Sequence, residues 1–568
     1  MRASAASCQQ AMGNLFTEFT LSVGIFERLQ AIDTQQAQTD TQRFHRNLLR
    51  EYRRAGVDRD AETRAQIQAL NQQIDALGQA FSKNIREDVR NVRVAQSSEL
   101  AGMPADYIDS LRRVNGEWLI STDYPEIFPL LRYAHNDALR KRIYIEFLNR
   151  GHPANESVLL EIIQLREQLA QLLGYAHFAD YATETAMIGS ASEAQAFIER
   201  ITSLASARAS RDYQLLVEEL QRDQPSASEV GNWQKAYLRE RAKQRIYAYE
   251  PQQVREYFSY PKVKQGMFEL ARSLFDVEIV DWDKPTWHSS VSAHELRDRN
   301  GKTLGYFYLD MHPRDGKYKH AAHFPVRSGV AAQQLPVSAL ICNFPSGDGG
   351  PGLMEHNQVE TFLHEFGHLM HSLLGGHQRW STISGITTER DFVEAPSQLL
   401  EEWVWNYETL ARFATNEQGE VLPYELFEKM RAARNFNRGA RTLHQMFYAA
   451  LSLHYYSEPA GQLDLRDAMV ALQGEYSPFG YIDGTHFYAN FGHLFGYNAR
   501  YYTYMWSEVI AADLFSEFRK NGLLDTRTAQ RYRDTVLAPG GARDAQALVE
   551  DFLGRPFNYD AFVKQLNE

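Results

Sequence analysis

Two histidines and a glutamate in one short stretch have the types and spacing needed to bind a metal ion. The stretch reads His364-Glu365-Phe366-Gly367-His368, with the histidines at positions i and i+4. On a helix, such residues lie one turn apart on the same face, so both imidazoles can reach a single ion. Zinc is the commonest fit to a set of imidazole and carboxylate ligands. The pattern therefore predicts a site for one Zn2+ ion per chain.

A third protein ligand is needed, and two residues are candidates. Glu394 lies just before Pro396, which suits the first turn of a second helix that could present this carboxylate to the ion. His371 follows His364 by two helical turns, about 10 Å along the axis, which is too far to join both histidines on one ion without distortion. Glu394 is the preferred third ligand, and His371 is the alternative.

Glu365 has a different expected role. It is turned about 100° from His364 around the helix, so it faces the open side of the metal. Zinc lowers the pKa of a bound water toward about 7, and a neighbouring carboxylate can take the proton as the water attacks a carbonyl carbon. The same carboxylate can pass that proton to a leaving amine. The spacing predicts amide hydrolysis with Glu365 as the general base.

A second group of polar side chains lies far downstream and consists of a histidine followed by closely spaced tyrosines. Its members are His493, Tyr497, Tyr501, Tyr502 and Tyr504. A phenol is a neutral donor that can stabilise the negative charge developing on a carbonyl oxygen during amide hydrolysis. Tyrosine-rich helices are also common in ordinary amphipathic packing. Spacing alone leaves both interpretations open.

The elements that position these residues are expected to be mainly helical. Apolar residues recur every three or four positions along 67–85, 158–169 and 190–204, which predicts three amphipathic helices. A capping-box pattern of Asn357 and Glu360 predicts the start of the helix that carries the metal motif. The glycine pair that begins at residue 375 is expected to end it.

A small sheet is expected before that helix. Asn300-Gly301 beside a β-branched and aromatic stretch is a strong hairpin signal. The predicted strands are 277–280, 303–310, 319–326 and 337–343. This change of pattern suggests two regions, a largely helical lobe over 1–275 and a catalytic region with a small sheet over 276–568.

Composition excludes several classes of protein. The chain has 568 residues, beyond the roughly 250–300 at which a single core stops growing, and its 44% hydrophobic content excludes a disordered or fibrous protein. The 72 acidic residues outnumber the 60 basic ones, so nucleic acid is not an expected partner. Two cysteines are too few for a disulfide framework or a Cys-rich structural zinc site. No apolar run approaches the about 20 residues of a membrane span, and the first residues lack the apolar stretch of a signal peptide.

The motifs together resemble the thimet oligopeptidase family of zinc metallopeptidases, which includes neurolysin, bacterial oligopeptidase A and dipeptidyl carboxypeptidase. The resemblance begins with the metal motif and the stretch 392–398 that contains Glu394. Further matches lie at 307–310, 316–322 and 501–507. The resemblance covers most of the chain.

The resemblance implies a mainly α, two-lobed helical clamshell that cuts short unstructured peptides. By that match, His364, His368 and Glu394 bind zinc and Glu365 is the general base. The resemblance also assigns substrate or oxyanion contacts to His493, Tyr501 and Tyr504. Tyr497 and Arg500 are further candidates for substrate binding, and the strand near His320 and Ala321 is expected to hold the peptide backbone by strand addition.

Two departures from the family pattern affect what can be carried over. Gly496 runs directly into Tyr497, whereas family members usually carry a Gly-Gly pair there, so substrate preference is left open. The chain also starts inside the family's N-terminal helical region. A cytoplasmic, monomeric protein with no membrane partner is expected, with the periplasm as the alternative location if an N-terminal segment is missing.

Three functions remain to be distinguished. The first is a zinc endopeptidase acting on oligopeptides. The second is a dipeptidyl carboxypeptidase, which would need a cationic group such as Arg500 for the substrate's terminal carboxylate. The third is a peptide-binding protein without catalysis, which would have no use for a base beside an open metal site.

Overall fold

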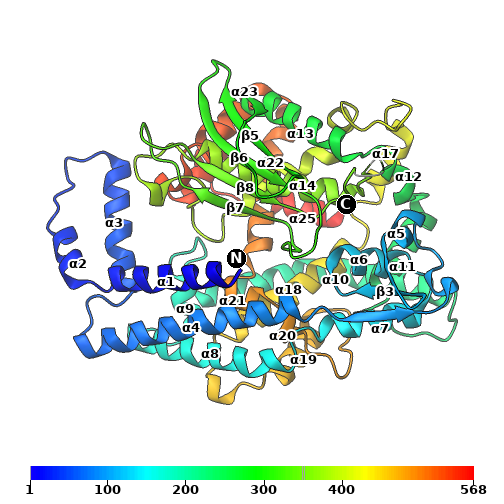
Figure 1. Cartoon of the computed structure of the whole chain (residues 1–568), viewed down its shortest axis with the longest axis horizontal. Helices are drawn as coiled ribbons and strands as arrows, with labels where there is room; N and C mark the ends of the chain where they lie inside the picture. The colour runs from blue at the N-terminus through cyan, green and yellow to red at the C-terminus, as the bar shows by residue number, and fades with distance from the viewer. Residues whose placement is uncertain (1, 348–349, 351) are drawn as a thin grey trace. The chain divides into compact units, whose positions relative to one another are not determined.

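The chain folds into two compact units, each formed by two stretches of sequence. The computed structural model describes residues 2–347, 350 and 352–568 (Figure 1). The first unit comprises the chain up to Ala242 together with Asn437–Tyr502, and the second comprises Lys243–Phe436 together with Thr503–Glu568. The predicted boundary between residues 275 and 276 does not coincide with this division, because 437–502 packs with the N-terminal helices in the first unit.

Long amphipathic helices form the first unit, and three of them are the helices expected from the apolar repeats. These are α4 (Ala61–Glu87), α8 (Ala154–Leu173) and α10 (Ala191–Gln221). Helix α4 packs along α8, and α10 packs along α18 (Arg438–His454) (Figure 1). Further helices are α1 (Arg2–Thr20), α2 (Val23–Gln30), α3 (Thr39–Arg54), α5 (Ala105–Ser110), α6 (Tyr124–Tyr133), α7 (Asp137–Leu148), α9 (Phe178–Thr183), α19 (Leu465–Tyr476), α20 (Phe487–Asn490) and α21 (His493–Gly496).

The first unit also contains a three-stranded antiparallel sheet that the sequence analysis did not predict. Its strands are β1 (Asn91–Val94), β2 (Arg112–Val114) and β3 (Glu117–Ser121), with β3 in the centre. Strands this short carry too few alternating positions to be recognised from periodicity. Val94, Trp118 and Ile120 lie in the same buried cluster as residues of α6 and α7.

A five-stranded sheet lies in the second unit. Its strands are β4 (Val277–Asp281), β5 (Val291–Asp298), β6 (Thr303–Asp310), β7 (Ala322–Arg327) and β8 (Val337–Ile341), in the order β4-β5-β6-β8-β7. Strands β5 and β6 form the predicted hairpin at Asn300-Gly301, and β6 pairs with β8 in parallel. The predicted strand near residue 319 begins only at Ala322, and the strand from Val337 ends at Ile341. The edge strand β7 is largely exposed.

Helix α14 (His356–Leu374) carries the metal motif and packs on strands β6, β7 and β8. The predicted cap at Asn357 and Glu360 is wrong by two positions. Glu355 is the N-cap residue, and its backbone N–H donates to the side chain of Gln358 at 2.9 Å, so the capping box forms two residues earlier in the chain. The predicted end at Gly375 is confirmed.

The remaining helices of the second unit surround α14 and the sheet. Helix α15 (Ala395–Glu401) packs directly on α14 and on α22 (Thr503–Asn521). The others are α12 (Pro251–Arg255), α13 (Tyr260–Phe275), α16 (Tyr407–Leu410), α17 (Tyr424–Ala432), α23 (Thr526–Tyr532), α24 (Ala545–Leu553) and α25 (Asp560–Asn567), while α11 (Lys235–Tyr247) begins in the first unit.

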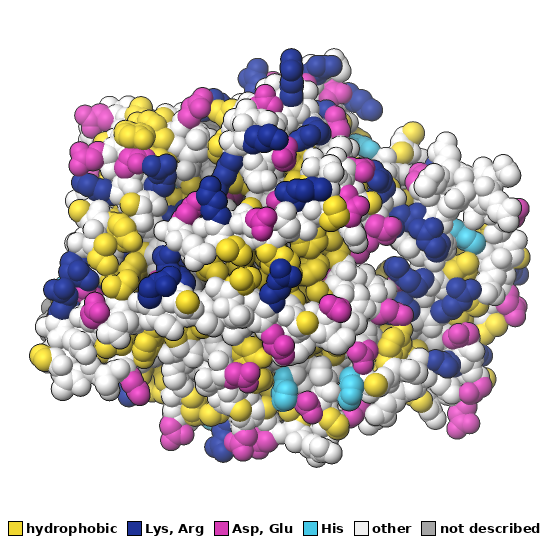
Figure 2. Space-filling model, turned by 180° about the vertical axis from the view of Figure 1, so that it is seen from behind, with side chains coloured by type: hydrophobic (Ala, Val, Ile, Leu, Met, Phe, Trp, Pro, Cys, Tyr) yellow, Lys and Arg dark blue, Asp and Glu magenta, His cyan; other side chains and the backbone are white. Residues whose placement is uncertain are grey.

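The predicted fold class, mainly α with a small sheet beside the metal-motif helix, is confirmed. Helices make up most of both units, and the two sheets are small. Within the described residues, no helix combines the length and apolar character needed to cross a membrane. Figure 2 shows Lys and Arg side chains interspersed with Asp and Glu side chains, so charges of both signs are mixed on the face that it displays.

Candidate metal centre

Helix α14 places the two imidazoles of the metal motif on one face. The ring centroids of His364 and His368 lie 5.0 Å apart, with the ring planes at 82° to each other. His368 is only 8% exposed, and His364 is partly exposed. This is the arrangement that the i, i+4 spacing predicts, and it would offer a single ion two nitrogen ligands from one helix.

Glu394 completes the group from the start of α15, where it is the N-cap residue. Its Oε2 atom lies 3.2 Å from His364 Nε2 and 3.0 Å from His368 Nε2. One ligand atom from each of the three residues lies within 4.8 Å of the other two. Burial opposes ionisation of Glu394, but the charges of His368 and His364 hold the pKa of its carboxyl group well below the usual value. Two nitrogen donors and one anionic oxygen are a donor set of the kind that catalytic zinc sites use.

A glycine inside the metal motif allows the two helices to approach closely. A Cβ atom on Gly367 would lie 2.6 Å from Cα of Ser397 and 3.1 Å from the carbonyl oxygen of Pro396. Ser397 in turn donates its hydroxyl to the carbonyl oxygen of Glu394 at 2.7 Å. The distance between α14 and the first turn of α15 therefore controls where the Glu394 carboxylate lies. Pro396 occupies the first turn of α15, as predicted.

We expect Gly367→Ala to destabilise the protein by about 1–3 kcal/mol, because an added methyl group must push α15 away from α14. The same displacement should weaken zinc binding by moving Glu394. Thermal unfolding with and without added zinc, together with a zinc titration against a competing chelator, would measure both effects. Gly474→Ala is a suitable control, since a Cβ atom at this exposed position of α19 would meet no atom within 4 Å. Wild-type stability and zinc affinity in Gly367→Ala would contradict this account of the packing.

Glu401, which the sequence analysis missed, contacts the first histidine. Nδ1 of His364 donates to Oε1 of Glu401 at 2.6 Å. A carboxylate in this position fixes the orientation of a ligating imidazole and leaves Nε2 to face the metal. Glu401 lies two turns after Glu394, which makes it a candidate by spacing, but its contact with His364 depends on how α14 and α15 pack.

Glu365, the predicted general base, lies on the same helix and is only 7% exposed. Burial raises the pKa of its carboxyl group above the ordinary value, while the charges of His364 and His368 act in the opposite direction. The backbone N–H of His323 in strand β7 donates to this carboxylate. Glu365 therefore lies next to His364 and His368, but it does not belong to the group formed by His364, His368 and Glu394.

His371, the alternative third ligand, is not part of this group of residues. Its side chain is fully buried, and burial lowers its pKa to about 3, so the imidazole is neutral. Neither of its ring nitrogens has a hydrogen-bond partner within the described part of the chain. The two turns of α14 that separate His371 from His364 explain why it lies outside the group.

Three more predicted residues lie in the second unit. His320 and Ala321 lie just before strand β7, and the side chain of Asn343 donates to the carbonyl oxygen of His320 at 3.2 Å. Tyr504 lies in the first turn of α22, where its carbonyl oxygen accepts a hydrogen bond from Gln398 of α15 at 3.0 Å. Tyr504 is therefore tied to the same short helix that begins at Glu394.

The other predicted residues belong to the first unit and form a group there. The ring centroid of His493 lies 5.1 Å from that of Tyr501 and 5.6 Å from that of Tyr497. The hydroxyl of Tyr501 donates to Gln445 at 3.1 Å, and Arg500 donates to the carbonyl oxygen of Ala182 at 3.4 Å. The roles of these four residues toward a substrate stay predictions.

Comparison with known proteins shows which class of protein carries this site. A family model described as peptidase family M3 matches residues 130–568. The relatives with similar sequences include oligopeptidases. Organellar oligopeptidase A of Arabidopsis thaliana is 31% identical over 540 residues, which cover 88% of this chain and 68% of the relative. Oligopeptidase A of Escherichia coli is 30% identical over 548 residues, covering 91% of this chain and 80% of the relative.

Solved structures agree on the fold. A putative oligoendopeptidase F matches with a TM-score of 0.56 at 13% identity, over 100% of this chain and 92% of the other. PZ peptidase A, solved with an inhibitor, matches with a TM-score of 0.53 at 14% identity, over 99% and 91% of the two chains. The family model and the related sequences define a peptidase, and the chain belongs to peptidase family M3. The predicted resemblance to the oligopeptidases of this family is confirmed.

Proposed function

We propose that this chain is a zinc-dependent endopeptidase that hydrolyses short oligopeptides. One observation carries the proposal: His364, His368 and Glu394 converge in a member of peptidase family M3, with Glu365 beside them. The donor set fits zinc, which when bound would polarise a carbonyl group and lower the pKa of water. Three protein ligands leave a position open for a reacting group.

The chain's own residues supply the remaining chemistry. Glu365 takes a proton from the attacking water and gives it to the leaving amine. Its burial among apolar and imidazole groups keeps this carboxyl group apart from bulk solvent and favours proton uptake. Glu401 holds the ring of His364 in the orientation that ligation needs.

The substrate contacts are proposed from the family membership. Tyr501, Tyr504 and His493 would donate hydrogen bonds to the peptide or to the oxygen that becomes negative during the reaction. Tyr497 and Arg500 would contact other parts of the substrate. The segment containing His320 and Ala321 leads into the exposed edge strand β7, which could add the peptide as a further strand. We also propose a monomeric, cytoplasmic protein without a nucleic-acid or membrane partner.

A digest of defined peptides, read by mass spectrometry with and without a zinc chelator, tests the proposal. Internal cuts that disappear with the chelator and return with added zinc support an endopeptidase. Stepwise release of C-terminal dipeptides would instead show a peptidyl-dipeptidase, and Arg500→Met should then abolish the preference for a free carboxyl terminus. Peptide binding without any cleavage would overturn the catalytic assignment.

A further inference from the structure

The segment 486–497 of the first unit carries two of the predicted substrate-contacting residues, His493 and Tyr497. It contains the short helices α20 and α21, which have few internal hydrogen bonds to define their position. Helices α7 and α8 and the turn between them hold the segment mainly through its backbone. The direction of the two side chains therefore depends on contacts made elsewhere in this unit.

Arg166 of α8 is the central contact. This side chain is only 5% exposed, and it donates to the carbonyl oxygens of Leu494 and Phe495 at 3.2 and 3.0 Å. It also donates to the hydroxyl of Tyr456 at 2.6 Å, and that hydroxyl donates to Leu494 at 2.6 Å. The planar guanidinium group thus fixes two consecutive peptide planes between His493 and Tyr497.

The ring of Phe495 secures the same turn from the other side. A Cβ atom on Gly78 of α4 would come within 1.9 Å of this ring, so the ring lies directly against the helix backbone. The guanidinium carbon of Arg166 lies 5.1 Å from the centre of the Phe495 ring. The turn at 493–496 is therefore packed between α4 and α8.

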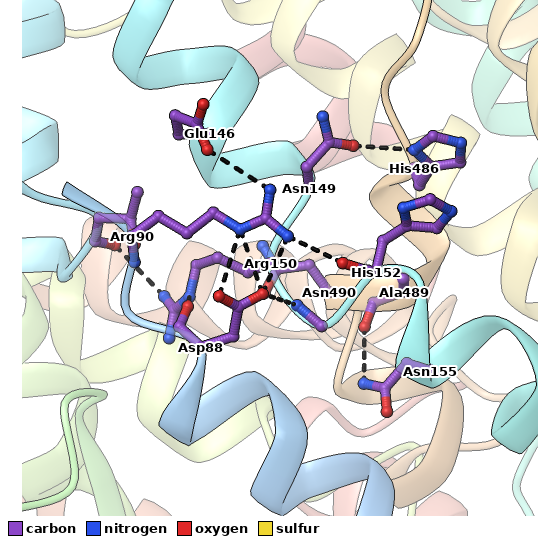
Figure 3. Close-up of polar contacts among 12 residues, drawn as sticks. Asp88, Arg90, Glu146, Asn149, Arg150, His152, Asn155, His486, Ala489 and Asn490 are labelled. Carbon is purple, nitrogen blue, oxygen red and sulfur yellow. Dashed lines mark hydrogen bonds and ion pairs between the residues drawn. The ribbon is translucent and has the colours of Figure 1, made fainter. Parts of the chain in front are cut away.

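Asn155, in the first turn of α8, fixes the preceding part of the segment. It is fully buried and donates to the carbonyl oxygen of Ala489 at 2.9 Å (Figure 3). It also donates to the carbonyl oxygen of Phe81 at 3.1 Å. Its own side-chain oxygen accepts from Asn84 at 2.9 Å. All hydrogen-bonding groups of this amide except one lone pair are used, so removing it would take a donor from the carbonyl oxygen of Ala489.

Two polar contacts near the surface extend the same attachment. His486 pairs with the side-chain oxygen of Asn149 at 2.9 Å (Figure 3). Asn490 donates to the carbonyl oxygen of Phe147 at 2.9 Å. Four successive points of the segment are thus bound to α7, α8 or the turn between them. Within the segment 486–497, Asn155 and Arg166 bind backbone carbonyl oxygens. These two residues therefore fix the backbone of the segment, whatever side chains the segment carries.

We infer that Arg166 and Asn155 are positioning residues for the peptidase reaction, holding the turn that presents His493 and Tyr497. The inference rests on the proposed function. Neither residue is assigned to the substrate itself, and both act through the backbone. Displacing reacting groups by about 1 Å can lower the rate about 100-fold. Loss of these buried contacts should therefore reduce the rate of catalysis more than loss of other buried contacts that contribute equally to the stability of the protein.

Arg166→Met and Arg140→Met form a matched pair for the test. Arg140 is 3% exposed and donates to the carbonyl oxygen of Ala134 and to the carboxylate of Asp137, both outside the 486–497 segment and outside the turn that holds it. Both variants should lose similar thermal stability. We expect Arg166→Met alone to lower kcat/KM for peptide cleavage by about 10- to 100-fold, with an unchanged zinc content. Arg166→Lys should recover part of this loss.

Hydrogen exchange read by mass spectrometry gives a result that does not depend on activity. Exchange of the 489–500 amides should rise in Arg166→Met and in Asn155→Ala, but not in Arg140→Met. Wild-type kcat/KM in Arg166→Met, or equal losses of kcat/KM in Arg140→Met and Arg166→Met, would overturn the positioning role. If Arg166→Met does not fold, Arg166→Lys carries the same comparison. A wild-type protein that cleaves no peptide would overturn the proposed function itself, whatever the exchange data show.

Discussion

Glu365→Gln should lower kcat/KM for peptide hydrolysis by about 10³- to 10⁴-fold while the protein still binds one zinc ion per chain. The amide has nearly the shape of the carboxylate but cannot accept a proton from water, so the contribution of general base catalysis is lost. The three grouped residues do not include Glu365, which is why metal binding should survive. Peptide cleavage rates and metal analysis of the same purified samples would measure both quantities.

Glu360→Gln provides the control for this experiment. Glu360 lies on the same helix, and its carboxylate accepts a hydrogen bond from Trp405 at 2.9 Å, which the amide oxygen of glutamine can also accept. The substitution therefore makes the same chemical change without touching the metal group. Substantial activity in Glu365→Gln, or an equal loss in Glu360→Gln, would show that Glu365 is not the base.

The parts of the site that could be predicted are those that depend on local geometry. His364 and His368 face the same way because an α-helix repeats every 3.6 residues, wherever that helix lies in the fold. Glu394 could be predicted because Pro396 marks the first turn of a helix and so places Glu394, two residues earlier, at the helix start. The long helices α4, α8 and α10 carry enough turns for their apolar repeats to be distinct.

The parts that could not be predicted depend on contacts between distant segments. The hydrogen bond between Glu401 and His364 exists because α14 and α15 pack closely at Gly367, and no local pattern encodes that packing. The same is true of 437–502, which joins the N-terminal helices although it follows the metal motif in the chain. The sheet of β1, β2 and β3 was missed for a different reason, since its strands have only three to five residues each.

Glu394→Ala should weaken zinc binding by more than about 100-fold, and it should abolish peptide cleavage at low zinc concentrations. The substitution removes the only carboxylate of the three grouped residues and leaves two imidazoles, which is one ligand fewer than catalytic zinc sites provide. Glu401→Gln is the graded comparison, because loss of a carboxylate that only orients a ligand typically costs about 10- to 100-fold in metal affinity. Competition with a chelator of known affinity would measure both variants.

The order of the two effects is the decisive point of this comparison. If Glu394 ligates the ion and Glu401 only orients His364, the zinc affinity must fall further in Glu394→Ala than in Glu401→Gln. Excess zinc should restore part of the activity in Glu401→Gln, since its ligand set is complete, whereas saturating zinc should restore little in Glu394→Ala. The reverse order would show that Glu401 is the third ligand and that Glu394 only contacts the two histidines. The structure favours Glu394 as the ligand, because its Oε2 atom lies 3.2 Å from Nε2 of His364 and 3.0 Å from Nε2 of His368.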